Sequence, residues 1–190
     1  MWSYNPTMKT KNLIIYAFID GQNLNLGTSK NTVKNEKLIY KGWKLDFKKF
    51  RIYLKNKFHV EKAFLFIGYL KQNELLYKSL KSYGYILVFK QTVKDNQGKT
   101  KGNVDAELVL HTSAIEYKNY DKAVIVSGDG DFSCLHKFLE KNGKLLSIVI
   151  PNRYSESSLL KDFQEYKIIL NREKSKLEFK LKNKNGGRSS

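Results

Sequence analysis

The sequence predicts an α/β fold, a three-layer α/β/α sandwich around a mainly parallel, five-stranded sheet. Five short apolar runs are continuous rather than alternating, which indicates strands that are covered on both faces. Helical patterns separate these runs, and strands that are joined by helical crossovers pair in parallel. With 190 residues, 41% of them hydrophobic, the chain is long enough for one domain with a substantial core.

The elements are expected in a regular order along the chain. The apolar runs predict strands at residues 12–20, 61–69, 85–92, 122–129 and 145–151. Apolar residues at helical spacing predict helices at residues 45–58, 73–84, 104–117, 131–143 and 157–169. The last patterned segment, residues 176–181, alternates like an edge strand or an extension.

Residues 12–170 are expected to form the domain, with a flexible tail at residues 1–11 and a basic, partly disordered extension at residues 171–190. Residues 25–45 are long and basic for a connection, so they form either a hairpin or a mobile loop that faces a substrate. The apolar run at residues 13–19 is shorter than a membrane span and lacks a cleavage site, so it is read as a strand rather than a signal peptide.

The chain carries 35 lysine and arginine residues against 18 acidic ones, a formal net charge of +17. A positive field over much of the surface favours polyanionic partners such as nucleic acid. A lysine-rich composition can also reflect codon bias, so charge alone does not identify the partner. Cys134 is the only cysteine, which excludes an internal disulfide and a cysteine-based zinc site, and a reducing cytoplasm fits this composition best.

Four acidic residues are expected at one rim of the sheet, although they lie far apart in the sequence. Asp20 ends the first strand, and Asp105 begins the helix after the third. Asp129 and Asp131 end the fourth strand, and in such sheets the chemistry gathers beyond the carboxyl ends of the strands. Packed carboxylates repel one another unless a cation offsets them, and hard oxygen ligands suit Mg²⁺ or Mn²⁺. We therefore expect a metal site that activates water for attack on a phosphodiester.

Each acid also has a purely structural interpretation. Asp131 could simply cap the following helix, and Asp105 could be a favourable charge at a helix N-terminus. Asp20 precedes a glycine, and Asp-Gly is common in turns. The placement of all four acids at one rim favours the metal site over separate structural roles.

Three motifs, in this order, resemble the NYN domain, the LabA-like branch of the PIN-type nucleases. They are FIDGQN at residues 18–23, KGNVD at residues 101–105 and VSGDGDF at residues 126–132. The segments GWKLDF, FIGY and SSLLKDF are also similar to that branch, so the resemblance covers about residues 13 to 170. It implies a PIN-like, metal-dependent ribonuclease fold in which acids at the strand ends bind Mg²⁺ or Mn²⁺.

The resemblance also implies roles for individual residues. Asp20 is similar to the family's first-strand acid, and Asn23 to the asparagine that follows it. Asp105 corresponds to the acid after the basic and glycine residues, and Asp129 and Asp131 to the two acids of the fourth-strand turn. Asp20, Asp105 and Asp129 would hold the metal. Asp131 would complete or tune the metal shell, and Asn23 would orient a water on the metal or the scissile phosphate.

Two further residues are candidates for substrate binding. Ser127 matches the small hydroxyl residue before the acids and would contact phosphate or water. Lys101, near Asp105, could contact the substrate backbone or be an ordinary solvated lysine. Basic residues in 30–51 and 172–188 would guide RNA to the site, which makes binding sensitive to salt.

The basic segments also contain aromatic residues, which stack on bases in many nucleic-acid-binding proteins. Tyr40, Trp43 and Phe179 could do so here. We expect two of the three to pack in the core instead.

These features leave three functions to compare. The leading hypothesis is a cytoplasmic endoribonuclease that hydrolyses single-stranded or structured RNA at an acidic pocket in a basic surface, with no membrane partner and with a homodimer left open. The alternative is a non-catalytic RNA-binding or adaptor module, which would bind RNA in EDTA and cut none in Mg²⁺ or Mn²⁺. A phosphatase of the haloacid dehalogenase type requires Asp-x-Asp on the first strand, and Gln22 occupies the second position here.

Overall fold

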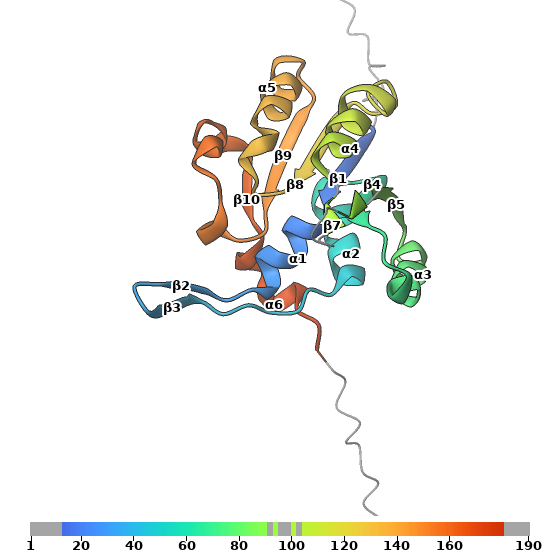
Figure 1. The fold of residues 1–190 in the computed structure, drawn as a ribbon. Helices are drawn as coiled ribbons and strands as arrows, with labels where there is room; N and C mark the ends of the chain where they lie inside the picture. The colour runs from blue at the N-terminus through green and yellow to red at the C-terminus, as the bar shows by residue number, and fades with distance from the viewer. Residues whose placement is uncertain (1–12, 91–92, 95–99, 102–103, 181–190) are drawn as a thin grey trace, which may run out of the picture.

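The structure, a computed structural model, describes residues 13–90, 93–94, 100–101 and 104–180 (Figure 1). Six strands form one sheet in the order β10, β9, β8, β1, β4, β5, and every neighbouring pair is parallel. Their bounds are β1 Ile15–Asp20, β4 Lys62–Gly68, β5 Tyr85–Lys90, β8 Lys122–Val126, β9 Leu145–Ile150 and β10 Lys167–Ile169. The expected α/β fold with a mainly parallel sheet is confirmed, with one strand more than the five expected.

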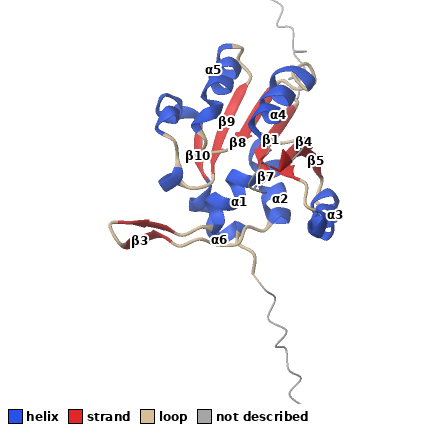
Figure 2. Cartoon of the chain, viewed as in Figure 1, coloured by secondary structure: helices blue, strands red, loops and turns tan. Residues whose placement is uncertain are grey.

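Helices cover both faces of this sheet (Figure 2). One face carries α1 Gly21–Ser29, α2 Phe47–Phe58, α3 Glu74–Ser82 and α6 Lys174–Leu177. The other face carries α4 Val104–Leu110, α5 Ser133–Lys141 and the 3₁₀ segment η5 Ser158–Tyr166. A π-helical turn at His111–Ile115 prolongs α4.

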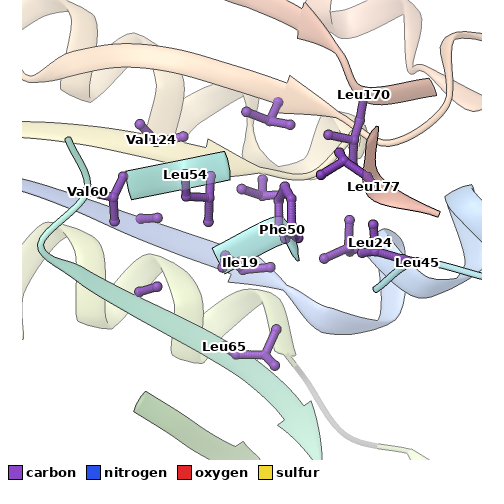
Figure 3. Packing of buried hydrophobic residues seen from close by; sticks show 14 of the residues in the cluster. Ile19, Leu24, Leu45, Phe50, Leu54, Val60, Leu65, Val124, Leu170 and Leu177 are labelled. Carbon is purple, nitrogen blue, oxygen red and sulfur yellow. The ribbon is translucent and has the colours of Figure 1, made fainter. Parts of the chain in front are cut away.

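Two apolar cores lie on either side of β1, whose six residues are all buried. On one face, Phe50 and Leu54 of α2 pack in the cluster that contains Ile19 (Figure 3). On the other face, the ring of Phe18 stacks on Phe64 with centroids 5.3 Å apart. Each side chain of this size contributes about 1.5–3 kcal/mol when it is fully buried. All six strands run parallel between these two cores, so their carboxyl ends meet at one rim of the sheet.

The prediction of one helix at residues 157–169 is wrong. Residues 158–166 form 3₁₀ turns in which Phe163 leaves helical geometry, with φ −102° and ψ 30°. Residues 167–169 form β10, which pairs in parallel with the otherwise open edge of β9. Leu160 and Phe163 are buried three residues apart, a spacing that a 3₁₀ turn satisfies as well as an α-helix does.

Residues 25–45 contain a hairpin, which confirms one of the two expected alternatives. Strands β2 Thr32–Lys34 and β3 Lys37–Tyr40 pair antiparallel and reach out from the body of the molecule (Figure 1). Asn35 and Glu36 form the turn, with φ of +48° and +62°, the backbone signs of a type I′ turn. We call residues 30–41 the basic arm.

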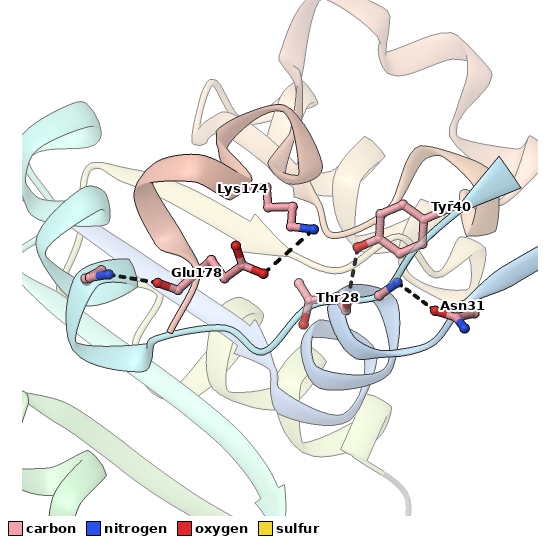
Figure 4. A network of polar contacts seen from close by, with 7 residues as sticks. Thr28, Asn31, Tyr40, Lys174 and Glu178 are labelled. Carbon is pink, nitrogen blue, oxygen red and sulfur yellow. Dashed lines mark hydrogen bonds and ion pairs between the residues drawn. The ribbon is translucent and has the colours of Figure 1, made fainter. Parts of the chain in front are cut away.

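Hydrogen bonds close the base of the basic arm and fasten it to α1 (Figure 4). The hydroxyl of Tyr40 donates to the backbone carbonyl of Thr28 at 2.9 Å, and Oδ1 of Asn31 accepts the N–H of Gly42 at 2.9 Å. An isolated two-stranded hairpin is marginally stable at best in water. These contacts therefore supply the support that the arm lacks along the rest of its length.

The segment after residue 170 also packs against the domain. Leu177 of α6 is 2% exposed, and its carbonyl accepts the N–H of Asp46 at 2.9 Å. The alternating segment at residues 176–181 forms one antiparallel bridge, between Glu178 and Leu45. The tail at residues 1–11 and the end of the extension at residues 181–190 lie outside the described residues. In the described part of the chain, no helix is long and apolar enough to cross a membrane.

Candidate active site

A cavity of about 490 Å³ opens at the carboxyl end of the sheet. Three carboxylates from distant parts of the chain line it, those of Asp20, Asp105 and Asp129. Parallel pairing of β1 with β8 aligns Ile19 with Val126, so the residues that follow these strands emerge side by side. The structure thus brings together three of the four acids expected at this rim.

Asp20 ends β1 and caps α1. Its Oδ1 accepts the backbone N–H groups of Gln22 and Asn23, both at 3.0 Å, and the residue is only 5% exposed. Gly21 has no room for a side chain, because a Cβ there would lie 2.4 Å from Cγ2 of Ile67. The Asp-Gly pair therefore turns the chain directly from a buried strand into a helix while the carboxylate stays at the cavity.

Burial and neighbouring charges disfavour the ionised forms of Asp20 and Asp105. Burial raises the pKa of Asp20 above its usual 3.8, and the charges of Asp105 and Asp129 raise it further, although the two N–H bonds of the cap oppose this rise. Burial also raises the pKa of Asp105, and the charges of Asp129 and Asp131 add to that rise, while Lys90 lowers it. A cation among these carboxylates would relieve their repulsion.

The turn after β8 gives its two acids different roles. Oδ1 of Asp129 accepts the backbone N–H of Asp131 at 3.1 Å, so Asp129 caps the short helix η3 Gly130–Phe132. The alternative in which Asp131 is the cap is therefore wrong. Asp131 is exposed and is not part of the lining of the cavity. Its expected place in the metal shell stays a prediction.

A glycine separates the two acids because another segment packs against it. A Cβ on Gly130 would lie 2.2 Å from Oγ of Ser157. The backbone N–H of Ser157 in turn donates to the carbonyl of Gly128 at 3.0 Å. The start of η5 thus closes over the acidic turn and holds its shape.

Ser127 and Asn23 hold the acidic turn, residues 127–131, through hydrogen bonds to its backbone. Ser127 is fully buried, and its Oγ accepts the N–H of Asp129 at 3.1 Å. Oδ1 of Asn23 accepts the N–H of Gly128 at 2.9 Å, which ties α1 to a turn 105 residues away. Asn23 also lines the cavity, whereas Ser127 is not part of the lining. A contact of Ser127 with phosphate or water stays a prediction.

Another part of the cavity wall consists of basic and neutral polar residues, of which only Lys30 lies in a range that the sequence patterns singled out for binding RNA. Lys30, Lys90, Asn152 and Ser155 all line it. Asn152 is buried, and its Nδ2 donates to Oγ1 of Thr32 at 3.3 Å, which joins the arm to this wall. Lys90 ends β5 and Asn152 follows β9 closely. Their positions at strand ends were the feature of the sequence that could have identified them as lining the cavity. Lys30 belongs to the basic range 30–51 that was expected to guide RNA to the site, and the fold shows that it lines the cavity itself.

Other expected substrate contacts have mixed outcomes. The backbone of Lys101 lies in β7 Thr100–Lys101, which pairs antiparallel with β6 Val93–Lys94, and its side chain lies outside the described residues. Tyr40 and Trp43 are buried, at 8% and 4% exposure, so the expectation that two of the three aromatic residues pack in the core is confirmed. Phe179 remains 42% exposed.

The donor set suits a hydrated divalent ion rather than a fully enclosed one. Within the described residues, no three Asp, Glu, His or Cys side chains are close enough together to form a ready-made metal site. Three carboxylates nevertheless share one cavity, and the charges of Asp105 and Asp129 raise the pKa of Asp20. Mg²⁺ usually keeps several waters and binds through one or two carboxylates. The residues therefore fit an ion that reaches some of them through water.

Comparisons with known proteins identify the fold and the family. The sequence profile of the NYN domain matches residues 15–170, which span the sheet from β1 to β10. A solved structure, of a protein of unknown function from Vibrio parahaemolyticus, matches with a TM-score of 0.65 and 19% identity, over 86% of this chain and 96% of that chain. At this identity the likeness shows the fold alone. No curated protein matches the chain.

NYN domains are part of the PIN-like nuclease superfamily, and they are generally ribonucleases. The matched range includes all three acids of the cavity. It also includes the motifs FIDGQN and VSGDGDF, which lie at the ends of β1 and β8. The chain belongs to the NYN domain family.

Proposed function

We propose that this protein is a metal-dependent endoribonuclease that hydrolyses phosphodiester bonds of RNA at the acidic cavity. The observation that carries this proposal is the convergence of Asp20, Asp105 and Asp129 in one cavity. Acids that repel one another are an unusual lining for a purely structural cavity in a chain of net charge +17. Membership of the NYN domain family supports RNA as the substrate.

The three carboxylates of the cavity are the proposed ligands of one or more Mg²⁺ or Mn²⁺ ions. When bound, such an ion would neutralise charge on the phosphate and lower the pKa of a coordinated water. Asp20 and Asp129 each use Oδ1 for a helix cap, which fixes the carboxylates before any ligand arrives. Asp131 is proposed to tune the site by its charge, which raises the pKa of Asp105.

The basic and neutral polar part of the cavity wall is proposed to hold the substrate. Lys30 and Lys90 would attract the phosphate backbone into a cavity whose acids would otherwise repel it. Asn152 and Ser155 add neutral donors on the same wall. Asn23, with Oδ1 committed to the acidic turn, positions Asp129 and can orient a phosphate or a water. Lys101 and Ser127 are further candidates for contacts with the substrate.

The test is a cleavage assay on labelled RNA and DNA in Mg²⁺, Mn²⁺ or EDTA. We expect the wild type to cut RNA in a divalent metal and not in EDTA. Asp20→Asn and Asp129→Asn should each lower the rate at least about 100-fold, because each removes a charged ligand while the amide can still cap its helix. Asp162→Asn is the matched control, because Asp162 is exposed and is not part of the cavity lining.

Two outcomes would contradict the proposal. One is intact RNA under every condition, combined with binding that persists in EDTA, which supports the non-catalytic RNA-binding module instead. The other is equal cleavage by the wild type and both cavity variants, which places any activity elsewhere on the molecule.

A further inference from the structure

Figure 1 shows α3 beside the edge of the sheet that β4 and β5 form. Three aromatic rings from this region contact one another. Tyr69 follows β4, Tyr77 belongs to α3, and Phe89 is the penultimate residue of β5. The rings of Tyr69 and Tyr77 stack, with centroids 5.7 Å apart and planes at 30°. Phe89 meets both edge-on, at 5.5 Å from Tyr69 and 4.9 Å from Tyr77.

Only one ring of this cluster is buried. Tyr77 is 6% exposed. Two hydrogen bonds fix its hydroxyl, which donates to the carbonyl of Gly68 at 3.1 Å and accepts the N–H of Leu70 at 2.8 Å. Tyr69 and Phe89 are 45% and 37% exposed. The buried ring thus holds two exposed rings in fixed positions.

The exposed rings line a hollow of about 230 Å³ together with charged residues. Lys78 and Lys81 of α3 line it, as does Glu74, whose Oε1 accepts the hydroxyl of Tyr69 at 3.3 Å. We call these residues the aromatic hollow: Tyr69, Glu74, Tyr77, Lys78, Lys81 and Phe89. Two lysines against one glutamate leave it positively charged.

The aromatic hollow and the acidic cavity each share one lining residue with a pocket between α1, β4 and α3. Gln22 lines both the acidic cavity and an apolar pocket of about 300 Å³ between α1, β4 and α3. Tyr77 lines both that apolar pocket and the aromatic hollow. The aromatic hollow therefore adjoins the acidic cavity by way of the apolar pocket, which places the rings beside the path of a flexible chain that leaves the cavity.

We propose that the aromatic hollow binds unpaired bases of single-stranded RNA, next to the strand segment that occupies the acidic cavity. This inference rests on the proposed function for the identity of the ligand. Exposed aromatic rings stack on bases of any sequence, and lysines beside them contact the intervening phosphates. In a duplex the faces of the bases are already stacked, so the hollow selects single strands.

Charge favours RNA over a second copy of the chain as the occupant. A copy that docked on α3 would bring its own lysines against Lys78 and Lys81, in a molecule of net charge +17. Like charges at an interface oppose association. A polyanion instead neutralises them, and the apolar rings become covered by bases rather than by protein.

The test measures binding, without cleavage, of a fluorescent single-stranded 12-mer RNA to the Asp129→Asn protein in EDTA. Tyr69→Ala and Phe89→Ala should each weaken binding about 10-fold, whereas Tyr69→Trp should retain it. Phe138→Ala is the matched control, because Phe138 is 39% exposed on α5 and should leave binding unchanged. Binding of duplex RNA should change little in all four variants.

Lysine variants keep the proposal testable even if the loss of a ring destabilises the fold. Lys78→Gln with Lys81→Gln should reduce the slope of log affinity against log salt by about 1.4, or about 0.7 for each phosphate contact on a single strand. An unchanged slope together with an unchanged affinity of Tyr69→Ala would overturn the proposal. A wild-type dimer that dissociates on Phe89→Ala, measured by sedimentation, would overturn it in favour of a second copy.

The two proposals fail separately. If the wild type cuts RNA but the ring variants bind normally, the nuclease stands and the aromatic hollow has no role in binding. If nothing is cut but Tyr69→Ala loses affinity for single strands, the nuclease falls and the aromatic hollow stands.

Discussion

Asp20 shows how one side chain can serve folding and chemistry at once. Its Oδ1 caps α1, its carboxylate faces a cavity with two other acids, and burial raises its pKa. Removal of the carboxylate therefore has two separable effects. An alanine would remove both the cap and the charge, whereas an asparagine removes the charge and leaves an oxygen that accepts the same N–H groups.

The raised pKa of Asp20 predicts a dependence of stability on pH. A carboxyl whose pKa is higher in the folded state favours folding below its unfolded pKa of 3.8, and this contribution is lost as the pH rises through the folded pKa. Asp20→Asn cannot ionise, so in EDTA at pH 7 we expect it to have a larger free energy of unfolding than the wild type. The difference should vanish as the pH falls towards 3.8.

Urea denaturation at several pH values checks this expectation. Asp162→Asn, at an exposed position, should stay within about 0.5 kcal/mol of the wild type throughout. A variant Asp20→Asn that is less stable than the wild type at pH 7 would show that the charged form of the cap outweighs the cost of burial.

Among the elements, the basic arm is the one that most clearly serves something other than the core. It exposes Lys34 and Lys37 near its turn, and its base reaches the wall of the acidic cavity at Lys30 and Thr32. Val33 and Leu38, opposite each other in the hairpin, are 59% and 54% exposed. Little of this ribbon is buried, so its stability depends on the bonds at its base.

We predict that the arm contributes to RNA binding through charge. Lys34→Gln with Lys37→Gln should lower the salt dependence of binding by about 0.7 for each phosphate of single-stranded RNA that these lysines neutralise. Cleavage of a dinucleotide, which is too short to extend from the acidic cavity to Lys34 and Lys37, should change little. Lys137→Gln with Lys141→Gln on α5 is the matched control, since both are exposed lysines at a similar spacing. Equal salt slopes for the two pairs would show that only net charge matters.

The sequence predicted the elements that the core dictates and missed those that tertiary contacts dictate. Continuous apolar runs revealed five strands, because strands covered on both faces must be apolar throughout. Helix α1 escaped prediction because its segment, GQNLNLGTS, has no apolar stripe, and the helix depends on the cap from Asp20 and the burial of Leu24. Strand β10 has three residues and exists only through its pairing with β9.

The same division holds for the site. Strand-end acids were predictable, because the order of strands places their carboxyl ends at one rim. Asn152 and the rings of the aromatic hollow were not, because no local pattern distinguishes them from surface residues. Lys30 was expected only as one of the basic residues in 30–51, without a place in the cavity. The assignment of the cap to Asp129 rather than Asp131 depends on the direction of a single turn, which composition does not encode.

For the molecule as a whole, a bound divalent ion should stabilise the fold, since three carboxylates that repel one another in the folded state are released from this repulsion. Mn²⁺ at about 100 times its dissociation constant should add about 2.7 kcal/mol to the free energy of unfolding. For a chain of this size we expect the melting temperature to rise by about 5 to 10 °C.

This prediction is independent of activity. Asp129→Asn should lose most of the rise in melting temperature, and Asp162→Asn should keep it. An identical rise in the wild type and Asp129→Asn would place the ion elsewhere, and a wild type without any rise would argue against metal binding at this cavity in the absence of RNA.

The turn of the basic arm bears on how long a substrate would stay bound. Glu36 holds φ of +62°, a conformation that glycine adopts freely and that costs other residues roughly 1–2 kcal/mol. It is also the only acid between residues 30 and 41. A glycine there would both relax the turn and make the arm more positive. With Glu36 in the turn, the arm would therefore bind a polyanion less tightly than it would with a glycine there. The weaker binding would favour rapid release of cut strands and hence repeated turnover.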